Sequence, residues 1–206
     1  MHLIEDQGSC KVIVVEGVDA VGKTTLINDY IIPHYKDIIR TPIKCVSGLQ
    51  SNFKSVALSL RAHHPIAELL VVLAAREQVL NRINYYCTKG YTVVCDRLDW
   101  TTRVMQLTDS NKAKLYEKVS PYLTRLSANV HYLLLDADTD VIKERLSIRS
   151  QMDDFETKDS AVIKARQSIY MQLYRNSRNA SLIRTDQKPA LIKQQVDQMI
   201  KDHFCN

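Results

Sequence analysis

The stretch "VVEGVDAVGKTTL", residues 14–26, holds two glycines five residues apart, followed by a lysine and two threonines. The whole chain contains only 5 glycines in 206 residues, so two of them in one loop indicate a specific demand on the backbone. Residues 17–24 match the pattern G-x-x-x-x-G-K-[ST], directly after an apolar run and before a segment with helical spacing. This order of strand, glycine-rich loop and helix predicts a loop whose backbone N–H groups converge on the phosphates of a nucleotide.

The side chains of this loop predict how the nucleotide is held. Lys23 supplies a positive charge near the β- and γ-phosphates, and the Thr24 hydroxyl is the kind of hard oxygen ligand that Mg²⁺ prefers. Asp19 is unexpected, because a carboxylate does not help to hold an anion. The sequence therefore predicts a P-loop protein that binds ATP with Mg²⁺. Its predicted ATP-binding residues are Gly17, Ala20, Gly22, Lys23, Thr24 and Thr25.

The order of apolar runs along the chain predicts the fold. Five short runs look like strands, and most are continuous rather than alternating, which is typical of strands buried on both faces of a parallel sheet. Segments with helical spacing separate them. This alternation predicts one α/β domain over residues 1–206, with a doubly wound five-stranded parallel sheet flanked by helices. The predicted strands are residues 11–16, 37–40, 92–96, 130–136 and 181–186.

Composition and charge exclude several classes of protein. The chain is 45% hydrophobic and 25% charged, and its net charge is +5. No basic run reaches the density of a nucleic-acid-binding arm, and no apolar run approaches the ~18 residues that span a membrane. Five cysteines are scattered and odd in number, which argues against a disulfide framework and a structural zinc site. We therefore expect a reduced, cytoplasmic protein without a nucleic-acid or membrane partner.

The loop motif alone leaves the kind of P-loop protein open. A Ras-type GTPase should carry N-K-x-D, but "NKAK" at residues 111–114 lacks the aspartate, which favours a small-molecule kinase. Such a kinase needs positive charge on the acceptor phosphate, and arginine supplies it with a bidentate fork. Arg97 and Arg40 end predicted strands, where ligands bind in a doubly wound sheet, and Asp96 is placed to contact Mg²⁺ or water. Arg76 lies amid an apolar helix, where a ligand role and an ion pair are equally open.

Residues 147–159, "SIRSQMDDFETKD", predict either an exposed loop or a lid that closes over the nucleotide. Lids exclude water from phosphoryl transfer and bring an arginine to the γ-phosphate. Arg145 and Arg149 lie four residues apart, on one face of the preceding helix. They are candidates for this role, unless both pair with acidic neighbours on the surface.

Taken together, these segments resemble the thymidylate (dTMP) kinase family of nucleoside monophosphate kinases, from about Lys11 to the C-terminal helix. "EGVDAVGKTT" looks like the family's P-loop, and "ELLVVLAAREQ" is similar to its helix with an Ala-x-Arg element. The most specific segment is "CDRLDWTTRVMQ", which resembles the family signature that begins with Asp-Arg. The resemblance implies an enzyme that transfers a phosphoryl group in line from ATP to a deoxynucleoside monophosphate, most simply dTMP to dTDP.

The resemblance also implies roles for individual residues. Lys23 and Thr24 would hold the ATP phosphates and Mg²⁺, with Asp96 as the second metal-site residue. Asp19 would face the deoxyribose 3′-hydroxyl and the transferred group, while Arg149 would stabilise the transferring phosphoryl group, because Ala20 stands where some members carry a P-loop arginine. The implied catalytic residues are Lys23, Asp19, Arg97 and Arg149. The implied acceptor-binding residues are Asp19, Arg40, Arg61, Val72, Arg76, Arg97, Thr101, Met105 and Gln106.

Three of these positions depart from the family pattern. Val72 stands where the family has a phenylalanine that stacks on thymine, a contact worth about 1–3 kcal/mol by analogy with nucleic-acid stacking. Met105 replaces the aromatic residue that crowds the ribose 2′ position, and Thr101 replaces a serine. The acceptor is therefore dTMP, a modified pyrimidine or a broader set of nucleoside monophosphates. The P-loop is also compatible with a deoxynucleoside kinase and with a non-catalytic nucleotide-binding protein. The family further implies a homodimer formed through the long helices.

Overall fold

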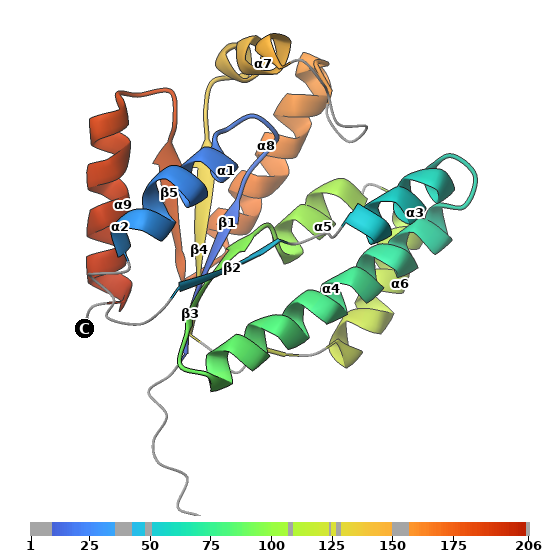
Figure 1. Cartoon of the computed structure of the whole chain (residues 1–206). Helices are drawn as coiled ribbons and strands as arrows, with labels where there is room; N and C mark the ends of the chain where they lie inside the picture. The colour runs from blue at the N-terminus through green and yellow to red at the C-terminus, as the bar shows by residue number, and fades with distance from the viewer. Residues whose placement is uncertain are drawn as a thin grey trace, which may run out of the picture.

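The computed structural model describes residues 10–35, 43–47, 51–106, 109–123, 125–126, 129–149 and 157–204. Strands and helices alternate along most of these residues (Figure 1). The strands are β1 Lys11–Glu16, β2 Ile43–Ser47, β3 Thr92–Asp96, β4 Asn129–Asp136 and β5 Ala180–Arg184. The helices are α1 Lys23–Thr25, η1 Leu26–Ile31, α2 Ile32–Tyr35, α3 Ser51–Arg61, α4 Pro65–Thr88, α5 Asp99–Gln106, α6 Ser110–Val119, η2 Ser120–Tyr122, α7 Thr139–Ile148, α8 Ser160–Arg175 and α9 Pro189–Phe204.

The five strands form one parallel sheet in the order β2-β3-β1-β4-β5. The central strand β1 pairs with β3 on one side, Val12 opposite Val93, and with β4 on the other, Val12 opposite Val130. The chain therefore crosses β1 on its way between the two halves of the sheet, as a doubly wound sheet requires. The predicted fold class is confirmed. The second strand lies at Ile43–Ser47, whereas the predicted run at residues 37–40 lies outside the described residues.

Helices lie on both sides of the sheet (Figure 1), and alternate residues of β1 pack in two different apolar clusters. Val12 and Val14 pack in one apolar cluster with residues of α4, including Val79. Ile13 and Val15 pack in the other cluster, which includes side chains of η1 and α9. All four of these β1 side chains are fully buried. The continuous apolar run of β1 is thus explained by a strand that has a core on both faces.

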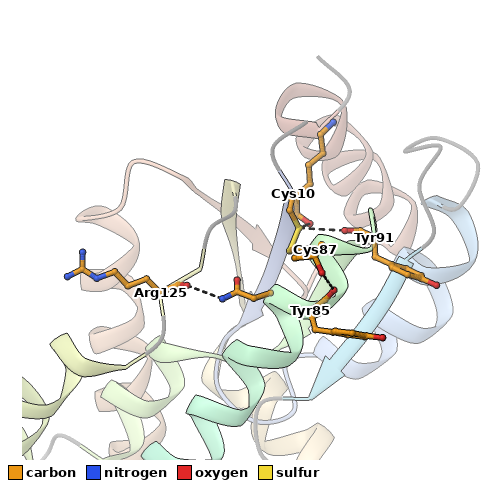
Figure 2. Close-up of a disulfide and its surroundings, with 8 residues drawn as sticks. Cys10, Tyr85, Cys87, Tyr91 and Arg125 are labelled. Atoms are coloured by element: carbon orange, nitrogen blue, oxygen red, sulfur yellow. Dashed lines mark hydrogen bonds between the residues drawn. A yellow bond between two sulfur atoms is a disulfide. The ribbon is translucent and has the colours of Figure 1, made fainter. Parts of the chain in front are cut away.

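A disulfide joins Cys10, just before β1, to Cys87 in the last turn of α4 (Figure 2). The expectation of reduced cysteines is therefore wrong for this pair. The two residues are 77 positions apart in the sequence, and their Cα atoms come within 5.2 Å only because β1 and the end of α4 pack together. Sequence spacing carries no signal for such a pair. Among the described residues, Cys45 and Cys95 are free thiols, the first exposed and the second buried.

The helices of the described ranges include none that is long and apolar enough to cross a membrane.

His131 is a buried histidine on β4, at the boundary between the sheet and α9. Its side chain is packed against the ring of His203, 4.0 Å between centroids, and its Nε2 lies 2.9 Å from the Ser181 hydroxyl. Burial first, and the neighbouring His203 second, lower the pKa of His131 from 6.5 to about 4. Between these two pH values the unfolded chain binds a proton that the folded chain does not. Stability therefore falls as the pH drops from 6.5 towards 4.

We predict that His131→Gln flattens this pH dependence. Between pH 7.5 and pH 5.0 the parent protein should lose about 1–2 kcal/mol more unfolding free energy than the variant, because only the parent carries the buried histidine. Urea denaturation at the two pH values measures the difference. His63→Gln, at an exposed histidine, is the matched control and should lose as much as the parent. Equal losses in the parent and in His131→Gln would contradict the prediction.

Candidate active site

The P-loop has the backbone geometry that its glycines predict. Gly17 has φ +139° and Gly22 has φ +91°, and Ala20 also lies in the left-handed region with φ +62°. A Cβ on Gly17 would lie 2.3 Å from the carbonyl oxygen of Leu135 on β4, so this glycine is required by a close approach of two backbones. A Cβ on Gly22 would meet no described atom within 4 Å. The two glycines thus serve different purposes: one seats the loop against the sheet, and the other allows the turn into α1.

Lys23 extends back over the loop that precedes it. Its side chain is buried, and its Nζ donates to the carbonyl oxygens of Val18, at 2.6 Å, and Gly17, at 3.1 Å. Burial first, and the positive charge of Arg97 second, lower the pKa of Lys23 to about 7. A bound phosphate chain would favour the protonated lysine, because it supplies the negative charge that the surroundings only partly provide.

Thr24 and Asp96 meet where β1 and β3 end. The Thr24 hydroxyl donates to Asp96 Oδ2 at 3.4 Å, while Asp96 Oδ1 is buried and has no hydrogen-bond partner in the described structure. No cluster of three metal-ligating side chains occurs in the described ranges. Such a sparse set of oxygen donors fits Mg²⁺, which keeps several waters and takes phosphate oxygens as further ligands.

A cavity of about 520 Å³ lies on the side of the P-loop that faces α7 and α9. Arg145 crosses its edge and donates to Thr185, 2.6 Å to the carbonyl oxygen and 3.1 Å to the hydroxyl, and to the Ala20 carbonyl at 3.4 Å. Arg149 also lines the cavity, as an exposed residue directly after α7. The cavity is continuous with the P-loop, so a nucleotide whose phosphates lie in the loop can place its base there. Its other lining residues are Val21, Gly22, Thr25, Leu26, Asp29, Tyr30, Gln187, Pro189, Ile192 and Lys193.

Asp19 and Arg97 form an ion pair on the opposite side of the P-loop. Arg97 directly follows β3, with φ +69°, and its Nη1 also donates to the Gly17 carbonyl at 2.9 Å and to the Thr101 hydroxyl at 3.2 Å. The left-handed turn returns the arginine towards the P-loop. Asp19 Oδ2 is buried and accepts no hydrogen bond from the described residues. A carboxylate oxygen aimed at this side can accept a hydrogen bond from a second ligand.

Glu16 joins the two loops that carry this pair. It is fully buried at the end of β1 and accepts from the backbone N–H groups of Leu98, at 2.8 Å, and Thr101, at 3.2 Å. The Thr101 hydroxyl also donates to it, at 2.5 Å. Burial, the largest effect, raises the pKa of Glu16. Glu16 is not among the residues predicted from the sequence, and its place directly before Gly17 is the only local signal for it.

Two further residues that sequence analysis did not select come from α8. The Tyr170 hydroxyl lies 2.8 Å from the Thr101 hydroxyl, and Arg166 Nη1 lies 3.7 Å from Asp19 Oδ2. They are four residues apart, so they share one face of the helix. No sequence motif marks them, because α8 reaches the site only through the tertiary fold.

The predicted ligand Arg76 is instead held by protein groups in this structure. It is 5% exposed in the middle of α4, and its Nη1 donates to the Thr102 hydroxyl at 2.6 Å and to the Leu98 carbonyl at 3.2 Å. Its Nη2 lies 3.5 Å from Asp99 Oδ1. Of the two roles that the sequence left open for Arg76, the structure shows the ion pair, which holds α5 against α4. A contact to the acceptor base stays a prediction.

Gln106 is likewise engaged, in a buried polar network between α4, α5 and α6. Its side-chain nitrogen donates to Glu68 at 3.2 Å, and its oxygen accepts from Lys112 at 2.9 Å. Lys112 in turn lies 2.5 Å from Glu68, which is 1% exposed, and Arg61 lies 3.8 Å from the same carboxylate. The network connects α4, α5 and α6 through these contacts, and contacts of Gln106 and Arg61 to the acceptor stay predictions.

Comparison with known proteins identifies the family. The family described as thymidylate kinase matches residues 15–196. The chain belongs to the thymidylate kinase family. It is 31% identical to a thymidylate kinase of Teredinibacter turnerae over 157 residues, covering 71% of this chain and 75% of that one. It is 23% identical to the enzyme of Mycoplasmoides gallisepticum, covering 94% of this chain and 97% of that one.

The same fold occurs in a solved structure, the thymidylate kinase of Candida albicans. The TM-score is 0.71 at 14% sequence identity, over 94% of this chain and 92% of that one. Its published description refers to the origin of broad substrate specificity and a novel structural element in that protein. Members of the family are nucleoside monophosphate kinases, so the chain is an ATP-dependent phosphotransferase.

Three predicted positions of this thymidylate kinase family member have no role assigned by geometry. Val72 lies on α4, one turn before Arg76, and Met105 lies in the last turn of α5, and both are half-buried. Arg40 lies outside the described residues, as do residues 150–156 of the predicted lid. The roles of Val72, Met105 and Arg40 stay predictions, and so does the catalytic role of Arg149.

We predict that the two P-loop glycines differ in their tolerance of alanine. Gly17→Ala should lower the unfolding free energy by at least about 3 kcal/mol, since the new Cβ would overlap the Leu135 carbonyl oxygen and neither backbone can yield. Gly22→Ala meets open space and should cost only the left-handed backbone penalty of about 1–2 kcal/mol. Urea denaturation compares the two, and equal losses would show that the seating of the loop against β4 is unimportant.

Proposed function

We propose that this protein phosphorylates a pyrimidine deoxynucleoside monophosphate, dTMP first of all, with ATP as the donor. The observation that carries the proposal is the Asp19–Arg97 pair beside the P-loop, with a buried carboxylate oxygen left to accept a hydrogen bond. A donor cavity lies across the loop, on the side of Arg145. The Asp19 carboxylate repels the phosphates of the donor. Its presence is explained if a second substrate, with a hydroxyl and a phosphate of its own, binds beside the donor.

The proposed chemistry is direct in-line transfer of the γ-phosphoryl group to the acceptor phosphate. Lys23 and the P-loop N–H groups hold the donor phosphates, and Arg97 holds the acceptor phosphate. Mg²⁺, held through Thr24 and Asp96 when bound, would neutralise charge on the donor phosphates. Glu16 fixes Thr101 and the backbone after Arg97, so the arginine is oriented before substrate arrives. Positioning and charge neutralisation provide the catalysis, with no covalent enzyme intermediate.

The acceptor base is the part of the proposal on which this chain departs from its family. Val72 offers no aromatic face to a pyrimidine, and Met105 is flexible where the resemblance implies a rigid ring. A 5-substituted pyrimidine or a wider set of monophosphates is therefore the second candidate. We place the activity in the cytoplasm, where its nucleotide substrates are present.

An ADP-release assay with Mg²⁺ and ATP tests the function. The acceptors are dTMP, dUMP, 5-hydroxymethyl-dUMP, dGMP, UMP and thymidine. We predict the highest kcat/KM for a pyrimidine deoxynucleoside monophosphate, and at least about a 100-fold loss of turnover in Lys23→Ala, since the lysine charge acts on the transferring phosphates. A preference for dGMP would contradict a pyrimidine site. Turnover of thymidine without dTMP would indicate a nucleoside kinase, and ATP binding without any transfer would indicate a regulator.

We also propose that two copies associate through the long helices, as the family resemblance implies. An apolar groove lies between α3 and α4, and two of its side chains, Val56 and Leu70, are each 48% exposed. Ile66, one turn before Leu70, is 38% exposed. Large apolar side chains that gather on one surface are characteristic of protein–protein contacts. The groove is lined by Asn52, Phe53, Val56, Leu70, Val71 and Ala74.

Leu70→Asp should convert the dimer to a monomer, because it would bury a carboxylate without a partner in the interface. Molar mass from light scattering during gel filtration measures the change. Leu191→Asp is the matched control, since Leu191 is 46% exposed on α9, on the other side of the sheet (Figure 1). A parent protein that elutes as a monomer, or a dimer that survives Leu70→Asp, would rule out this interface.

A further inference from the structure

Arg166 comes from a helix that the predicted site did not include, yet its guanidinium points into the acceptor side. Its Nη1 lies 3.7 Å from Asp19 Oδ2, the carboxylate oxygen that accepts no hydrogen bond from the described residues. Arg97 binds the other oxygen of the same carboxylate. The side chain of Arg166 is 16% exposed, so it is largely withdrawn from water. Asp19 is therefore bracketed by two arginines from different parts of the chain.

Three arginines influence one another beside Asp19. Arg166 is affected by the positive charges of Arg61 and Arg97, and Asp19 is the carboxylate that faces both Arg97 and Arg166. The pKa of Arg166 is lowered, and burial is the largest cause. The negative charge of Asp19 raises this pKa, while the positive charges of Arg61 and Arg97 lower it further. Among the described residues, Arg61 lies 3.8 Å from Glu68, a carboxylate that also contacts Lys112. Like charges that are brought together and partly desolvated are costly unless a ligand of opposite charge joins them.

We propose that Arg166 is a binding residue for the phosphate of the acceptor nucleotide, which it clamps together with Arg97. This inference rests on the proposed function and names a further residue of the same site. A monophosphate dianion carries the charge that guanidinium groups bind, and Arg97, from the loop after β3, and Arg166, from α8, can each form charge-assisted hydrogen bonds to it. Asp19 attracts both arginines and so orients them towards the same side of the P-loop.

The arrangement on α8 supports a role towards the acceptor rather than the donor. Tyr170, one turn after Arg166, lies 2.8 Å from the Thr101 hydroxyl and 3.4 Å from Arg97, both on the acceptor side. The donor cavity is lined by two other arginines, Arg145 and Arg149, and Arg166 does not line it. The helix thus presents one face, made of Arg166 and Tyr170, to the loop that follows β3.

Paired binding measurements test the role. Calorimetry without ATP gives the Kd of dTMP and of thymidine, which differ only in the phosphate, for the parent, Arg166→Gln, Arg166→Lys and Arg175→Gln. Arg175 is an exposed arginine in the last turn of the same helix, so its replacement is the matched control. We expect Arg166→Gln to raise the Kd of dTMP about 10–100-fold, the worth of one charge-assisted hydrogen bond, and to leave thymidine binding within about twofold. Arg166→Lys should retain part of the dTMP affinity, and Arg175→Gln all of it.

Two results would overturn the proposal. Equal losses of dTMP and thymidine affinity would mean that Arg166 only supports Asp19. An unchanged Kd for dTMP with a lowered kcat would mean that it acts on the transferring group instead. Failure of the proposed function is detected separately, with the parent enzyme in the acceptor assay. If the parent prefers another monophosphate, that nucleotide and its nucleoside replace dTMP and thymidine. ATP affinity, unchanged in all variants, confirms that each protein is folded.

Discussion

The carboxylate of Glu16 is the constraint on which the site depends. It is buried at the end of the central strand, and it holds the backbone N–H groups of Leu98 and Thr101 and the Thr101 hydroxyl. A buried carboxylate is costly unless its oxygens are satisfied, so the loop after β3 is fixed in the one position that satisfies them. That position places Arg97 beside the P-loop. A single residue thus connects the strand that leads into the phosphate loop to Arg97, the arginine proposed to bind the acceptor.

Asp19 divides the site into its two halves. The P-loop turns its backbone towards the donor side, while the Asp19 side chain turns to the acceptor side and pairs with Arg97 and Arg166. On the donor side, by contrast, Arg145 is held by backbone and hydroxyl oxygens of Thr185 and Ala20. Arginines therefore lie on both sides of the P-loop. The Asp19 carboxylate pairs with those on the side where the acceptor is proposed to bind. In the proposed function, the placement of this one acidic group would give the two anionic substrates separate positions.

The wall of the acceptor side is built from buried polar groups rather than from apolar packing alone. Arg76 connects α4 to α5, and Gln106 connects both helices to α6 through Glu68 and Lys112. Such networks cost free energy to bury and stabilise the protein only when every member has a partner. Their effect is a rigid wall whose polar groups are already engaged. This rigidity is a physical reason to expect that base preference depends on other side chains, of which Val72 and Met105 are the predicted ones.

The sequence by itself determined the parallel sheet, the phosphate loop and the family, because these are local patterns: apolar runs of strand length, a glycine spacing around Lys23, and the Asp-Arg pair at the end of β3. It also pointed to Asp19 as the unexplained residue of the loop. Only the tertiary structure decided which groups meet. Arg166 and Tyr170 approach Asp19 and Thr101 from α8, and Cys10 meets Cys87, across separations in sequence that no spacing rule covers. The packing of the helices on the sheet decides which side chains contact each other, and no local sequence pattern encodes that packing.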